Sequence, residues 1–194
     1  DLGLTLIITD HHRYGSTLPN AHAIVHPTVG GDYPNPDLCG AGVAFKLAWA
    51  VAKHLSNAEK VSPEFRDFLA GAVGLVALGT IADVVPLRGE NRVLARFGLA
   101  NLKESRLCGL NALIESAKLA DQKLNSEHVG FWLAPRINAA GRMGHALLAA
   151  ELLTRADADR AREIAQYLEE QNRSRQNMER RIFNEAVAMV TERK

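Results

Sequence analysis

The sequence predicts an α/β fold with few parallel strands, mostly helices, and a long helix at the end of the chain. Three observations support this prediction. Two short apolar runs, at residues 4–9 and 23–27, each lead into a loop that contains glycine and proline. Segments with apolar faces at helical spacing fill most of the chain up to residue 156, and residues 157–194 read as one continuous helix.

The first run, Leu4 to Thr9, reads as a buried core strand, and the run from Ala23 to Pro27 reads as a second strand stopped by its proline. The predicted helices run in this order: Gly40 to Ser56, Ser62 to about Leu78, Glu90 to Lys103, Gly109 to Ala117, Ser126 to Pro135, and Asp157 nearly to the end. We expect the first helix to be deeply buried. The many small residues of the second predict close packing against a neighbour.

Composition narrows the class of protein. The chain has 194 residues, 47% of them hydrophobic, and 23 basic against 22 acidic residues, so bulk charge does not indicate a nucleic-acid-binding protein. Because glycine, threonine or charge interrupts the apolar runs, we expect no segment that spans a membrane. The two cysteines, Cys39 and Cys108, fit neither a disulfide framework nor a metal knuckle, and a reducing cytoplasm is the expected location.

The triplet Asp10-His11-His12 is the first candidate site, because it lies where the first predicted strand ends. Successive side chains on an extended backbone point to opposite sides, so the two imidazoles should have different tasks. One could bind a divalent metal while the other faces a phosphate or donates a proton, with Asp10 fixing a ring tautomer. A polar strand end that enters a loop is the alternative.

Two later stretches carry further candidates. Asp83 stands among apolar residues, where a partly desolvated carboxylate needs a metal ion or an arginine, unless it caps the next turn. Arg136, Asn138 and Arg142 stand in a short glycine-containing connector, which predicts an anion cradle or, alternatively, a solvated turn.

The last predicted helix is apolar at both ends and polar in its middle, which is typical of a strut between two packed bodies. Arg173 and Arg175 stand in the polar middle and could line a nucleic-acid path, with a solvated, salt-bridged face as the alternative.

Three blocks, in this order, resemble the DHH phosphoesterase superfamily: Asp10-His11-His12 after a strand, Gly79 to Leu87 with Glu90-Asn91-Arg92 behind it, and Pro135 to Arg142. Within the superfamily, nearly the whole chain resembles the single-strand-specific 5′→3′ DNA exonucleases of repair and recombination. The resemblance implies a partial DHH phosphoesterase domain at residues 1–156, followed by an interdomain connector helix at residues 157–194.

The resemblance also implies a site with two Mn²⁺ or Mg²⁺ ions. His11 and Asp83 would be metal ligands, His12 would contact the scissile phosphate, and Asp10 would orient or share in the metal site. Arg142, with Asn138 and Arg136 nearby, would bind substrate phosphate. The implied partners are single-stranded DNA and repair proteins such as a single-strand-binding protein, with no membrane.

The family's Asp-x-Asp element and a further aspartate precede the triplet, and this chain does not contain them. We therefore expect the 194 residues alone to bind metal poorly and to have little nuclease activity. The chain starts without methionine and ends inside a predicted helix, so a fragment of a longer protein is expected. Two alternatives remain: a DHH phosphodiesterase of short oligonucleotides or cyclic dinucleotides, and a catalytically silent DHH-like scaffold.

Overall fold

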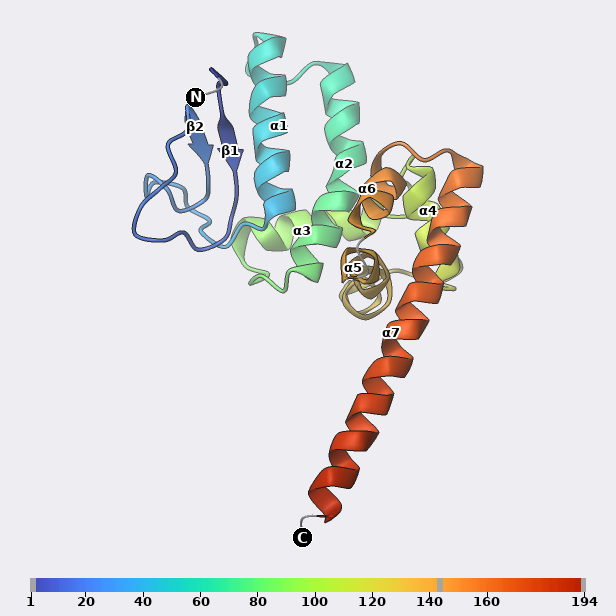
Figure 1. The fold of residues 1–194 in the computed structure, drawn as a ribbon. Helices are drawn as coiled ribbons and strands as arrows, with labels where there is room; N and C mark the ends of the chain where they lie inside the picture. Colours follow the sequence, from blue (N-terminus) through green and yellow to red (C-terminus); the bar gives the residue numbers. More distant parts are fainter. Residues whose placement is uncertain (1–2, 143–144, 193–194) are drawn as a thin grey trace. The chain divides into compact units, whose positions relative to one another are not determined.

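The computed structural model describes residues 3–142 and 145–192, with the backbone alone at residues 142 and 192. It divides into two compact units, Asp1–Glu104 and Ser105–Lys194, and each is described by itself. The first unit contains these elements: β1 (Ile7–Thr9), β2 (Ala23–Val25), α1 (Gly40–Ser56), α2 (Pro63–Ala82) and α3 (Gly89–Asn101) (Figure 1). The predicted domain boundary after residue 156 stays a prediction.

The two strands pair in parallel, with Ile8 opposite Ile24, as predicted. Pairing continues past β1, because the Asp10 N–H donates to the carbonyl of Val25 at 3.2 Å. Parallel strands bring their carboxyl ends to one edge, so the residues that follow β1 and β2 become neighbours. The prediction that the first strand is buried is wrong, since Ile7 is 56% exposed. Among the described residues β1 has one pairing strand, and much of its apolar surface is therefore uncovered.

Helix α1 has the predicted bounds and is capped by the Cys39 sulfur, which accepts a hydrogen bond from the Gly42 N–H. Its predicted deep burial is wrong, because Trp49 and Leu55 are 45% and 63% exposed. The helix packs along one face, against α2 and β1.

Helix α2 begins at the predicted Ser62 cap but runs four residues past the predicted end, to Ala82. The buried hydroxyl of Thr80 donates its proton to the carbonyl of Val76, one turn earlier in the same helix. Contrary to expectation, α2 is long and apolar enough to cross a membrane by length and composition alone. It packs against both α1 and α3, and this packing accounts for its apolar composition.

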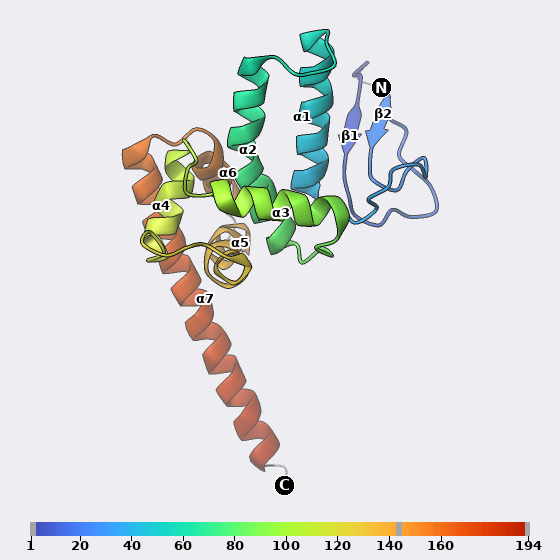
Figure 2. The same ribbon diagram turned by 180° about the vertical axis from the view of Figure 1, so that it is seen from behind.

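Small residues bring the three helices close together, as predicted. A Cβ on Gly79 would lie 2.6 Å from the Cβ of Ala41 in α1, and a Cβ on Gly98 would lie 2.3 Å from that of Ala77. Helix α3 therefore crosses α2 at short range (Figures 1 and 2). Leu38, Val43, Val76 and Leu94 form one buried apolar cluster of this unit.

The second unit contains α4 (Cys108–Ser116), a π-helix η1 (His128–Leu133), α5 (Ala134–Arg142), α6 (Ala146–Thr154) and α7 (Ala158–Glu192). Residues 136–142 were expected to form a connector, and this expectation is wrong because they belong to α5. Pro135 is the second residue of α5, which follows η1 without a break. Helix α6 is not among the predicted helices.

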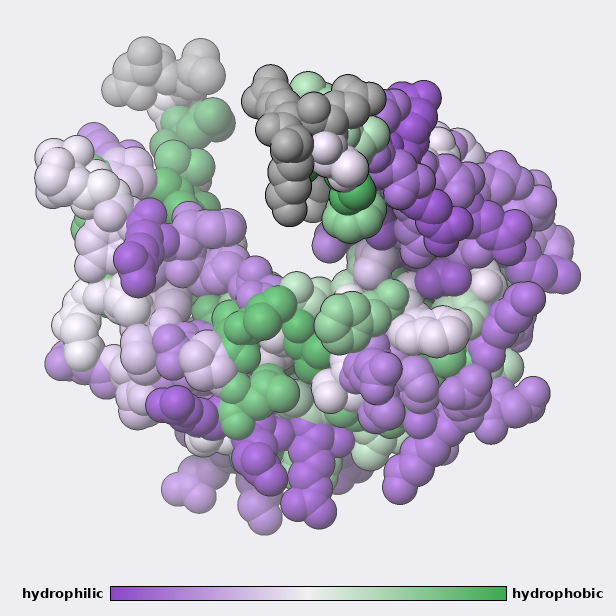
Figure 3. All heavy atoms as spheres, turned by 90° about the horizontal axis from the view of Figure 1, so that it is seen from below, coloured by the Kyte–Doolittle hydropathy of each residue, from purple (hydrophilic) through white to green (hydrophobic). Residues whose placement is uncertain are grey.

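The predicted final helix is confirmed as α7, which has 35 residues. Helices α4, α5 and α6 pack against α7, and Ile164 and Leu168 are buried there. Apolar side chains near the end of α7 are exposed, among them Phe183 at 68% and Val190 at 62%. Apolar side chains also reach the surface in the space-filling view of Figure 3.

Candidate metal and phosphate site

His11 and Asp83 meet in the first unit, although they stand 72 positions apart along the chain. The Nδ1 atom of His11 lies 3.5 Å from the Oδ2 atom of Asp83, and their side chains are 18% and 41% exposed. The Asp83 carboxylate thus has a partner, as its apolar neighbours required, and that partner is an imidazole. A polar pair with access to solvent forms at the end of β1.

Local packing places both side chains. Asp83 caps the C-terminus of α2, and its N–H donates to the carbonyl of Gly79 at 2.9 Å. The ring of His11 lies on Gly40 at the start of α1, where an added Cβ would stand 3.1 Å from the ring. The first turn of α1 and the last turn of α2 are also joined by the Cys39 sulfur and the Thr80 hydroxyl, 3.4 Å apart. The helix crossing therefore fixes the distance between His11 and Asp83.

Asp10 organises the two histidines. Its Oδ1 atom accepts the backbone N–H groups of His11 at 2.7 Å and His12 at 3.2 Å, and it lies 2.8 Å from Nδ1 of His12. The His12 side chain and the two N–H donors lower the pKa of Asp10 from 3.8 to about 2. Because the carboxylate accepts, Nδ1 of His12 carries the proton in this contact, and Nε2 is left for another partner.

The two imidazoles lie side by side, with ring centroids 4.2 Å apart. The expectation that they point to opposite sides is wrong, because the strand ends at Thr9 and the Asp10 carboxylate folds the next two residues into a turn. Ligand atoms of Asp10, His11 and His12 all lie within 4.8 Å of one another, so these three residues could hold a metal ion.

Asn91 is a supporting residue whose role the sequence did not indicate. Its side chain is 1% exposed, and its amide group donates to the carbonyls of Asp37 at 2.7 Å and Pro86 at 3.1 Å. Its carbonyl accepts from the side chain of Asn35 at 2.9 Å. The segment before α1 and the loop after Asp83 are thereby tied to α3. The sequence block Glu90-Asn91-Arg92 marked Asn91 as part of a motif, but it did not predict which groups the Asn91 side chain contacts.

Strain accompanies the turn after Asp83. Val84 has φ of 57°, a left-handed conformation that β-branched residues rarely adopt, and its side chain is exposed. Such a residue is kept only where its surroundings hold it, and strained positions cluster at functional sites. Here the Val84 N–H donates to the carbonyl of Ile81 at 3.2 Å.

The predicted phosphate-binding residues lie in the second unit. Arg136 is 9% exposed, and its guanidinium lies 2.6 Å from Oε2 of Glu169, an ion pair by distance that lacks hydrogen-bond geometry. The guanidinium also donates to the carbonyl of Trp132. Arg136 thus bridges α5 to α7 in this structure, which contradicts its expected place in an open cradle.

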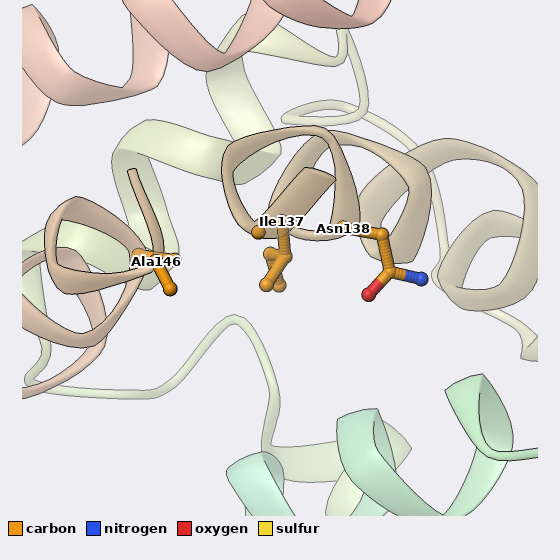
Figure 4. A pocket seen from close by; sticks show the side chains of 5 residues that line it. Ile137, Asn138 and Ala146 are labelled. Atoms are coloured by element: carbon orange, nitrogen blue, oxygen red, sulfur yellow. The ribbon is translucent and has the colours of Figure 1, made fainter. Parts of the chain in front are cut away.

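Asn138 is exposed and lines a shallow pocket of about 480 Å³ together with Ile137, Gly141, Ala146 and Ala149. Figure 4 shows the side chains of Ile137 and Asn138 extending from α5 on the same side, with Ala146 coming from α6. The side chain of Arg142 lies outside the described residues, so its predicted phosphate contact stays a prediction.

The arginines predicted to line a nucleic-acid path are paired along α7. Arg173 lies 2.8 Å from Glu169, and Arg175 lies 2.5 Å from Glu179. These are i, i+4 pairs on one helix, as the alternative of a salt-bridged face predicts. The DNA path along these arginines stays a prediction.

Comparison with known proteins gives one family. Residues 1–73 match the model of the DHH family, N-terminal domain. The single-stranded-DNA-specific exonuclease RecJ of Bacillus subtilis is 44% identical over 98% of this chain, and that of Escherichia coli is 38% identical over 97%. The chain spans 23% and 33% of the length of these two relatives.

Solved structures give the same result. The crystal structure of RecJ from Thermus thermophilus in complex with Mn²⁺ is 37% identical, with a TM-score of 0.82, over 95% of this chain and 26% of that one. A crystal structure of exonuclease RecJ bound to manganese has a TM-score of 0.83 over 96% of this chain and 45% of that one. The predicted partial DHH fold is confirmed.

Proposed function

The chain belongs to the DHH family, and we propose that the whole protein is a divalent-metal-dependent exonuclease that hydrolyses single-stranded DNA in the 5′→3′ direction. One observation carries this proposal: His11 and Asp83, from two separate sequence blocks, lie 3.5 Å apart beside Asp10 and His12. The similarity to RecJ over 95% to 98% of the chain supports the substrate class.

The donor set fits the metals found with RecJ. The cluster offers carboxylate oxygens from Asp10 and Asp83 and imidazole nitrogens from His11 and His12, and no thiolate stands among them. Hard oxygen ligands with imidazole suit Mn²⁺ or Mg²⁺. When bound, such ions lower the pKa of a water molecule and stabilise charge on a phosphate. In this proposal His11 and Asp83 hold metal.

The remaining residues of the triplet have separate tasks. Asp10 accepts the Nδ1 proton of His12, and in the imidazolium form the outer nitrogen of His12 also carries a proton that it can donate to a phosphate oxygen. His12 is well suited to that contact because its side chain is 76% exposed. Asp10 also orients the backbone of His11 and could share in the metal site. In this proposal Asn138 and Arg142 bind substrate phosphate.

The proposal is tested with the whole protein on 5′-phosphorylated single-stranded DNA in the presence of Mn²⁺. We expect shortening from the 5′ end, and a loss of activity of at least about 100-fold in Asp83→Asn, since even groups behind a metal ligand are worth 10- to 100-fold. Asp67→Asn, which changes an exposed aspartate at the other end of α2, is the matched control and should keep full activity.

Two other results would point to other functions. Turnover of short oligonucleotides or cyclic dinucleotides without degradation of long strands would favour a small-substrate phosphodiesterase. DNA binding without any hydrolysis would favour a scaffold.

The cellular setting belongs to the same proposal. A single-strand exonuclease acts where single strands are exposed, in repair and recombination in the cytoplasm, beside a single-strand-binding protein. Two free cysteines, Cys39 and Cys108, suit that reducing compartment. Copurification of the whole protein with a single-strand-binding protein would test the partner.

A further inference from the structure

His26 connects the triplet to a second segment of the chain. It follows β2 directly, as Asp10 follows β1, so the parallel pairing brings the two strand ends together. The Nε2 atom of His26 lies 2.9 Å from the carbonyl oxygen of His12. Among the described residues, this contact holds the backbone of His12 from outside its own loop.

The hydrogen bonds of His26 define its tautomer. The backbone N–H of Thr28 points to Nδ1 of His26 at 3.1 Å, and a backbone N–H can only donate. Nδ1 must therefore accept, and the proton of the neutral ring lies on Nε2. That proton is then donated to the His12 carbonyl, so both ring nitrogens are used in defined roles.

The surroundings keep His26 in place. Pro27 comes next and is buried, and a residue before proline is restricted to extended conformations. The ring of Tyr14 meets the ring of His26 edge to face, with centroids 5.4 Å apart. A rigid strand end thus presents the imidazole to the exposed loop that follows His11.

We propose that His26 is a positioning residue: it holds the His12 carbonyl and so directs the His12 imidazole toward the scissile phosphate. This inference rests on the proposed nuclease function. Asp10 fixes the His12 ring relative to its own turn, whereas His26 fixes that turn relative to β2. A displacement of about 1 Å at a reacting group can cost about 100-fold in rate, so a contact with the backbone of His12 suffices to matter.

Two substitutions in the whole protein separate the two hydrogen bonds. In His26→Asn the short side chain can still accept from the Thr28 N–H but cannot reach the His12 carbonyl. In His26→Gln the longer amide can donate to that carbonyl. His22→Asn changes an exposed histidine at the other end of β2 and is the matched control.

We expect kcat on single-stranded DNA with saturating Mn²⁺ to fall by roughly 10- to 100-fold in His26→Asn, with KM unchanged. His26→Gln should recover most of the loss, and His22→Asn should match the wild type. A wild-type kcat in His26→Asn, an equal loss in both His26 variants, or a rise in KM alone would overturn the inference and leave the proposed function intact. A wild-type protein without hydrolysis would overturn both.

Discussion

The two units treat their predicted polar residues differently. In the first unit, Asp10 and Asp83 are carboxylates whose described neighbours are imidazoles and backbone N–H groups, so oxygen lone pairs stay open toward solvent. In the second unit, Arg136, Arg173 and Arg175 each lie within 2.8 Å of a glutamate oxygen. These three arginines share two glutamates, Glu169 and Glu179, so each guanidinium already has a carboxylate partner within the unit.

This difference shows which property allows a group of polar residues to bind a ligand. A cluster can bind a metal or a phosphate when its own neighbours do not complete its charge. The first unit meets this condition at the end of β1, whereas Arg136, Arg173 and Arg175 of the second unit act as internal ties between and along helices. The predictions below test this contrast, beginning with the largest expected effect.

Arg136→Ala should destabilise the second unit by about 3 kcal/mol, because it leaves the carboxylate of Glu169, 17% exposed, without its buried partner. Arg173→Ala removes an exposed arginine from the same glutamate and should cost less than about 0.5 kcal/mol. Hydrogen exchange of the α5 and α7 amides in the whole protein would measure both. Unchanged exchange in Arg136→Ala, together with weaker DNA binding, would return Arg136 to the phosphate-binding group.

Gly79→Ala should destabilise the first unit by about 1–3 kcal/mol, since the new methyl group would overlap the Cβ of Ala41 at 2.6 Å. The same change should weaken Mn²⁺ activation, because this crossing sets the distance between His11 and Asp83. Gly71→Ala is the control on the same helix: its Cβ meets nothing within 4 Å, and it should stabilise by about 0.5–1 kcal/mol. Urea unfolding gives both values, and equal effects would refute the tight crossing.

Val84→Gly should stabilise the first unit by about 1 kcal/mol, because glycine adopts a φ of 57° without strain. Val85→Gly, at the next position, has no positive φ to relieve and should destabilise. Urea unfolding midpoints compare the two variants. A loss of stability in Val84→Gly would show that the left-handed turn is not strained.

The carboxyl group of Asp10 should titrate near pH 2 in the metal-free protein, below its ordinary pKa of 3.8. Because the folded-state pKa is lowered, the contact with His12 is fully present above about pH 3.8 and is lost as the pH falls through about 2. In His12→Ala the midpoint should move up toward 3.8, since the His12 side chain is the largest cause. Carbon-13 NMR of the aspartate carboxyl groups follows the titration, and an unshifted midpoint in the wild type would contradict this role of His12.

Much of the first unit could be predicted from its sequence, for local reasons. Apolar residues at helical spacing defined α1 at Gly40–Ser56, the Ser62 cap defined the start of α2, and strand patterns located β1 and β2. The convergence of His11 with Asp83 followed from a motif resemblance. Periodicity alone would not have joined residues 72 positions apart.

The remaining features depend on tertiary contacts that no local pattern contains. The hydrogen bonds of Asn91 and the contact of His26 with the His12 carbonyl join segments distant in sequence. Pro135 was read as a helix end, although proline is equally compatible with a first helical turn, and α5 was therefore missed. The glutamate partner of Arg136 comes from another helix, and the sequence did not distinguish this pair from an open arginine.

The central claim is that His11 and Asp83 serve one metal site, and a double-mutant cycle on kcat for Mn²⁺-dependent hydrolysis of single-stranded DNA tests it most directly. Residues that act as a unit give strongly non-additive losses. His11→Ala and Asp83→Ala should each lose at least about 100-fold, and the double variant should lose less than about 10-fold more than either. Losses that multiply in the double variant would show that the two residues act independently, and the claim would be wrong.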